Sequence, residues 1–61
     1  LGYIEEIVLK LIADNEGLSA RKISKLIDKS LKTTMRYLED LKKSEKIEFR
    51  GALKNGGYYL K

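Results

Sequence analysis

The first part of the chain carries apolar residues at the spacing of one face of an α-helix. They recur at intervals of three and four residues with charged positions between them: Tyr3, Ile4, Ile7, Val8, Leu11 and Ile12. This spacing is typical of an amphipathic helix, and Glu5 and Glu6 suit its positive N-terminal end. The pattern predicts a first helix over about residues 2–14, followed by Gly17, which suits the left-handed conformation found after helix ends.

Two further helical patterns follow, and each begins with a serine. Ser19 and Ser30 suit N-cap positions, because a serine hydroxyl accepts a hydrogen bond from a free backbone N–H of the first turn. We expect a second helix over about residues 19–27 and a third over about residues 30–44. So few residues separate the two helices that the joint between them must turn sharply.

After the third helix the apolar period changes from that of a helix to that of a strand. Residues 47–50 alternate apolar and polar, and residues 58–60 are rich in strand-forming side chains. The sequence Asn55-Gly56 between them is a strong signal for a hairpin turn. We therefore predict a two-stranded hairpin over about residues 46–61, packed on the helices because an isolated hairpin is marginally stable.

Together the two periodicities predict one small core in an α+β domain. A chain of 61 residues hides only about 60% of its unfolded surface, so one modest core is the limit. From the hairpin we also expect Tyr58 and Leu60 to face inward. The residues expected to be mostly buried are Ile7, Leu11, Ile23, Leu26, Met35, Leu38, Leu41, Ile47 and Phe49.

Composition excludes most kinds of catalytic and metal chemistry. The chain has no cysteine and no histidine, so disulfides, zinc fingers, cysteine nucleophiles and histidine bases are all excluded. The acidic pairs Glu5-Glu6 and Glu39-Asp40 are adjacent, so each pair diverges by about 100° on a helix and cannot share a substrate. We predict no catalytic residue, no metal site, no cofactor and no enzyme activity. The apolar runs are also too short to cross a membrane.

Charge is unevenly distributed along the chain. The net charge is +4, yet the first 20 residues hold one lysine against four acidic residues. The remaining residues hold twelve lysines and arginines against five acidic residues. Such segregation indicates two faces with different roles, one of them suited to nucleic acid. The alternative is an ordinary solvated surface on which the charges are segregated by chance.

The order of predicted elements resembles that of the winged helix-turn-helix family. Residues 18–41 resemble the family's central stretch, residues 30–38 its recognition helix, and residues 47–51 with 57–60 its wing. The chain is particularly similar to the C-terminal winged-helix modules of bacterial and archaeal regulators that carry Fic or Alba-type domains. The resemblance implies a three-helix bundle followed by a β-hairpin wing, as a single domain over residues 1–61.

Helix geometry sorts the third helix into two faces. Residues 31, 35, 38 and 41–42 are assigned to the core side. A helix fits the major groove of B-DNA, and an arginine can fork onto a guanine edge. The opposite, outer face then presents hydrogen-bond donors, which are Lys29, Lys32, Thr33, Arg36 and Tyr37. Ser30, with the free N–H groups beside it, is suited to a phosphate as well as to capping.

The second helix and the wing supply further candidate contacts. In the architecture that the chain resembles, the second helix crosses the DNA backbone, so Arg21 and Lys22 are expected on phosphates. Arg50, Lys54 and Asn55 flank or occupy the hairpin tip, where a cation can reach a phosphate or the minor groove. A merely solubilising turn is the alternative for these three residues.

We therefore expect a DNA-binding domain of a prokaryotic transcriptional regulator, with the third helix in the major groove and the wing on the backbone or minor groove. The expected partners are double-stranded DNA and a second copy, bound through the first helix or the rest of a longer protein. The chain begins at Leu1, which favours a piece of such a protein, cytoplasmic and nucleoid-associated. The alternative is a protein-interaction or dimerisation module, which should expose apolar anchors on the third helix.

Overall fold

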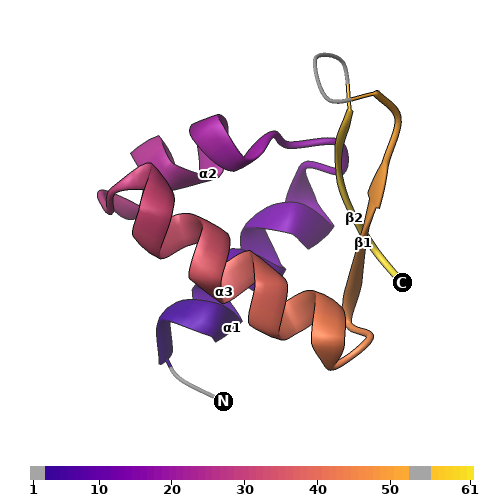
Figure 1. Cartoon of the computed structure of the whole chain (residues 1–61), viewed down its shortest axis with the longest axis horizontal. Helices are drawn as coiled ribbons and strands as arrows, with labels where there is room; N and C mark the ends of the chain where they lie inside the picture. The colour runs from indigo at the N-terminus through magenta and orange to yellow at the C-terminus, as the bar shows by residue number, and fades with distance from the viewer. Residues whose placement is uncertain (1–2, 53–55) are drawn as a thin grey trace.

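The computed structural model describes residues 3–52 and 56–61, and in this part three helices precede an antiparallel pair of strands (Figure 1). The predicted α+β class and order of elements are confirmed. In Figure 1, α3 crosses in front of α1, with α2 above it and the two strands beside it. The elements are α1 (Tyr3–Asp14), α2 (Ala20–Ile27), α3 (Leu31–Lys43), β1 (Ile47–Arg50) and β2 (Gly57–Leu60).

Both predicted serine caps are present. Ser19 Oγ accepts a hydrogen bond from the backbone N–H of Lys22 at 3.2 Å, and Ser30 Oγ accepts one from that of Thr33 at 3.2 Å. Asp28 ends α2 in the left-handed conformation with φ of 56°, and its N–H donates back into the last turn of that helix. The chain therefore turns sharply from α2 into α3 within three residues.

The core lies where the three helices meet the inner side of the hairpin. Half-buried residues, including Ile4, Leu18 and Phe49, pack around it. Four of the residues predicted to be mostly buried lie at its centre, namely Ile23, Leu38, Leu41 and Ile47. Val8, Ile12 and Tyr58 complete this buried cluster.

Helix α1 buries a different stripe from the predicted one. Ile7 and Leu11, expected to be mostly buried, are only half-buried. The buried stripe is instead Glu5, Val8 and Ile12. Apolar residues occupy two adjacent stripes of this helix, and its contacts with α2, α3 and β2 cover only one of them completely. Periodicity therefore identified the helix but placed its inward face one residue away.

Two further core predictions are wrong, since Leu26 is 55% exposed and Met35 is 38% exposed. On α2 the buried positions are Ile23 and Ser24, which leaves Leu26 on the outside. On α3 the fully buried residue is Thr34. Because Thr34 takes the inward position, the side of the helix that contains Met35 is left partly exposed.

The hydroxyl of Thr34 explains how a polar side chain enters the core. Its Oγ1 donates to the carbonyl of Ser30 at 2.9 Å, so the polar group is satisfied locally and the methyl group can pack inward. The buried edge of α3 is consequently Thr34, Leu38 and Leu41, rather than the side that contains Met35.

The two strands pair with Ile47 opposite Leu60 and Phe49 opposite Tyr58. The rings of Phe49 and Tyr58 meet edge to face, with their centroids 5.1 Å apart. Tyr58 is buried as expected, whereas Leu60, also expected to face inward, is 38% exposed. Leu60 is the last residue of β2, where the sheet ends and less of the protein covers it.

The hairpin is tied to the helices through the loop that follows α1. Tyr58 N–H donates to the carbonyl of Leu18 at 2.8 Å, and Gly17 N–H donates to the carbonyl of Tyr58 at 2.9 Å. Gly17 has φ of 95°, the left-handed conformation that the sequence predicted. A side chain on Gly57 would collide with the backbone of Gly17, so the close approach requires glycine there.

A matched pair of leucine truncations tests these core assignments. Leu38→Ala should cost about 2–5 kcal/mol, the range for truncating a buried leucine, which would remove most of the stability of so small a domain. Leu26→Ala should change the free energy of unfolding by less than about 0.5 kcal/mol, since its side chain is mostly exposed. Urea unfolding followed by circular dichroism measures both. Equal losses in the two variants would contradict the burial described here.

Candidate nucleic-acid interface

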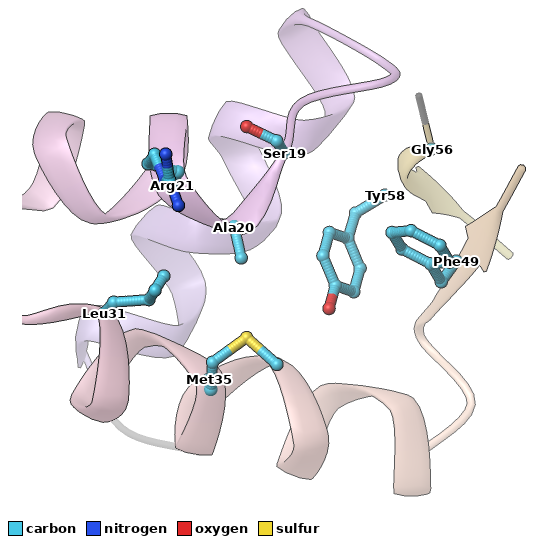
Figure 2. A pocket seen from close by; sticks show the side chains of 8 residues that line it. All are labelled: Ser19, Ala20, Arg21, Leu31, Met35, Phe49, Gly56 and Tyr58. Atoms are coloured by element: carbon cyan, nitrogen blue, oxygen red, sulfur yellow. The ribbon is translucent and has the colours of Figure 1, made fainter. Parts of the chain in front are cut away.

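A hollow of about 530 Å³ lies between the start of α2, the first half of α3 and the wing (Figure 2). Figure 2 shows Leu31 and Met35 on one side of this space and Phe49 and Tyr58 across from them. Its lining residues are Ser19, Ala20, Arg21, Leu31, Met35, Phe49, Gly56 and Tyr58. We call this space the wing hollow. Among the described residues, this lining contains one cation, Arg21, and no acidic side chain.

The outer face of α3 differs in part from the predicted one. Lys32 and Arg36 are exposed, as predicted, whereas Thr33 and Tyr37 are half-buried. The Thr33 hydroxyl also accepts a hydrogen bond from Ser30 Oγ at 3.0 Å. These two residues are drawn inward because they flank the buried edge of α3.

Leu31 and Met35 take the outward positions instead, and they are 43% and 38% exposed. Sequence reasoning missed them because it counted large apolar side chains as core. The neighbouring threonines carried the missing signal, since a threonine in a helix can satisfy its own hydroxyl on the preceding turn and become buried.

Charged side chains are unevenly distributed along the exposed surface of α3. Its first half carries Lys32 and Arg36. Its second half carries the exposed Glu39 and Asp40, and Glu39 Oε1 lies 3.8 Å from Lys42 Nζ. Lys42 and Lys43 are exposed in the same half and balance these two acidic residues. An anionic partner is therefore attracted most strongly to the first half of the helix.

The start of α2 extends the basic surface, and in the joint before α3 Lys29 follows the exposed Asp28. Arg21 and Lys22 are exposed in the first turn of α2, and Arg21 also lines the wing hollow. Lys29 and the capping Ser30 are exposed between the two helices. Lys29 and Ser30 lie at the N-terminal end of α3, where the helix dipole adds positive potential.

Arg50 in the wing is held by other residues of the protein. Its Nε donates to Glu48 Oε2 at 2.8 Å, and its Nη2 donates to the same oxygen. The hydrogen bond and the charge of Glu48 raise the pKa of Arg50. The guanidinium also stacks over the ring of Tyr59, 4.8 Å from its centroid. The predicted tip residues Lys54 and Asn55 lie outside the described residues.

Two further observations concern the acidic side chains and the phenol of Tyr58. Within residues 3–52 and 56–61, no three acidic side chains come together in a way that would hold a metal ion. Burial, helped by the charge of Glu39, raises the pKa of Tyr58, so this phenol stays neutral in the core. No helix in the same ranges has the length and apolar character needed to cross a membrane.

Comparisons with known proteins bear on the family and the fold of this chain. A family model described as winged helix-turn-helix DNA-binding matches residues 2–48. The fold is similar to that of MepR from Staphylococcus aureus, a transcription regulator of the multidrug efflux pump MepA, with a TM-score of 0.89 at 16% identity. That match covers all of this chain and 47% of the regulator, so the chain spans about half of that protein's length. A search of curated protein sequences gave no match.

The family match covers all three helices and reaches the first strand of the wing. The structural match, at low identity, extends over the complete chain and supports the same fold. Both agree with the winged-helix order of elements described above. The chain therefore belongs to the family of winged helix-turn-helix DNA-binding domains.

Proposed function

We propose that this domain binds duplex DNA with the first half of α3 in the major groove, as the DNA-binding part of a transcriptional regulator. The observation that carries the proposal is the exposed pair Lys32 and Arg36 on that half of α3, beside the exposed Arg21. A helix fits the major groove, and its N-terminal residues usually reach the bases. The exposed Leu31 and Met35 are apolar side chains on α3 of the kind expected for a protein-interaction module, but family membership favours DNA binding.

Base reading is assigned to the exposed cations of α3. Arg36 offers a planar fork for the two acceptors of a guanine edge. Lys32 lies one turn before it and contacts a base edge or a phosphate. Thr33 and Tyr37 lie at the half-buried margin of this face, so we expect weaker contributions from them.

Phosphate contacts are assigned to the start of α2 and the joint. Arg21 and Lys22 lie in the first turn of α2, the helix that crosses the backbone in this architecture. Lys29 and Ser30 lie just before α3 and suit a phosphate at its N-terminal end. Contacts of this kind position the protein without reading sequence.

The wing is proposed to lie on the backbone or the adjacent minor groove, with Arg50, Lys54 and Asn55 as its contacts. Arg50 forms an ion pair with Glu48. To contact a phosphate, Arg50 must therefore break this ion pair. Glu48 therefore weakens the wing contact of this domain.

The remaining assignments concern the larger protein. We infer a homodimer formed through α1, where Tyr3 is 76% exposed, or through segments beyond this single domain. The partial coverage of the matching regulator supports a longer protein, and its description as a transcription regulator supports the same role. Such a protein would act on the DNA of a prokaryotic cell, in the cytoplasm and nucleoid, without enzyme activity.

Salt dependence tests the proposed phosphate contacts. If Arg21, Lys32 and Arg36, with or without Arg50, each neutralise a phosphate or meet a base edge, the logarithm of the affinity should fall with the logarithm of the salt concentration. The slope should be about −3 to −4, since each phosphate contributes about −0.9. Fluorescence anisotropy with a labelled duplex at several salt concentrations measures it. Binding that is weak and insensitive to salt would contradict the groove-binding proposal.

Two arginine variants should separate base reading from backbone contact. Arg36→Ala should relax base preference at one position and cost about 1–3 kcal/mol of binding. Arg21→Ala should weaken binding to all sequences alike and flatten the salt slope by about 1. Lys10→Ala, an exposed cation of α1 outside this surface, serves as the control and should leave both measurements unchanged. Identical effects of the two arginine variants would refute the division of roles.

Releasing Arg50 should strengthen binding. Glu48→Gln removes the anion that holds Arg50, so duplex affinity should rise about two- to fivefold, as expected for loss of an exposed ion pair. The double variant Glu48→Gln/Arg50→Ala, measured against Arg50→Ala alone, controls for the general gain in positive charge. A gain of the same size in the absence of Arg50 would show that the pair does not restrain the wing.

A further inference from the structure

Leu31 and Met35 make the DNA-facing side of α3 partly apolar. They are four residues apart, so they lie on one stripe of the helix, about 6 Å from each other along its axis. They remain 43% and 38% exposed in the folded domain. Both side chains are among those that line the wing hollow (Figure 2).

The surroundings of this pair restrict what can bind there. Ala20, Phe49 and Tyr58 add apolar lining to the wing hollow, and Arg21 stands at its margin. Lys32 and Arg36 each follow one member of the pair on the helix. An occupant must therefore present small apolar groups and negative charge together.

Duplex DNA has both features in its major groove. Each thymine presents its C5-methyl group there, and apolar side chains are the usual contacts of that methyl group. Phosphates on either side supply the negative charge. Leu31 and Met35 are about one helical turn apart, so they can contact the methyl groups of two different base pairs.

We propose that Leu31 and Met35 read thymine methyl groups, which makes the domain prefer A·T pairs beneath the first half of α3. This inference rests on the proposed placement of α3 in the major groove. It assigns a second kind of reading to the helix, beside the guanine reading of Arg36. An apolar segment of a protein partner could fill the same hollow, but it would leave the three surrounding cations without anions.

Removing the methyl groups alone tests the proposal. Two duplexes with the same alternating A·T sequence are compared, one with thymine and one with uracil, which lacks only the C5-methyl group. The wild-type domain should bind the uracil duplex more weakly, by roughly fourfold for each methyl group that leaves an apolar contact. Competition titrations at one fixed salt concentration measure the ratio of the two affinities.

Three glutamine variants locate the origin of any preference. Leu31→Gln and Met35→Gln should each reduce the thymine-to-uracil ratio. Leu26→Gln, an exposed leucine of α2 that does not line the wing hollow, should keep the wild-type ratio. All three positions are exposed in helices and glutamine is a good helix former, so the thermal unfolding of each variant should remain near that of the wild type.

The outcomes separate the inference from the function on which it rests. Equal binding of the two duplexes by the wild type would overturn methyl reading and leave DNA binding in place. A ratio that persists in both Leu31→Gln and Met35→Gln, or falls equally in Leu26→Gln, would also overturn it, since the preference would then come from duplex shape or from elsewhere in the protein. Failure to bind either duplex would overturn the proposed function itself.

Discussion

The buried edge of α3 decides what the rest of the surface can do. Thr34, Leu38 and Leu41 form that edge, and Thr34 can join it because its hydroxyl donates to the carbonyl of Ser30. In a small domain, a helix can bury only one of its sides against the core. Once this edge packs against the other elements, the stripe that contains Met35 must face outward. The side chains that a partner can contact on α3 therefore depend on the hydrogen bond between Thr34 and Ser30.

The wing depends on a second constraint, the close approach between β2 and the loop after α1. Two backbone hydrogen bonds join Tyr58 to Gly17 and Leu18, and the absence of a side chain on Gly57 makes room for them. Tyr58 is thereby fixed in the core, and Phe49 meets it edge to face. The wall of the wing hollow is therefore set by the packed base of the hairpin and not by its tip.

The helix caps and the order of elements could be predicted from the sequence, because they depend on neighbouring residues. The choice of which helix face is buried could not, because it depends on how the elements pack together. The caps Ser19 and Ser30 and the element order rest on residues next to one another. Periodicity could not choose between adjacent stripes, which is why Leu26 and Met35 were placed in the core. The pairing of Arg50 with Glu48 was predictable in principle, because residues two apart in a strand lie on the same face.

The site residues combine two kinds of interaction with different consequences. Cations such as Arg21 contribute affinity for any sequence, since phosphates are the same everywhere. Selectivity needs groups that touch base edges, and the proposal assigns this role to the outward stripes of α3. In the second half of that helix Glu39 and Asp40 offset Lys42 and Lys43, so the net positive charge of α3 lies in its first half. Leu31, Met35 and Arg36 share that short segment. In the proposed complex, discrimination between A·T and G·C pairs would depend on the balance between apolar and forked polar contacts within two turns of one helix.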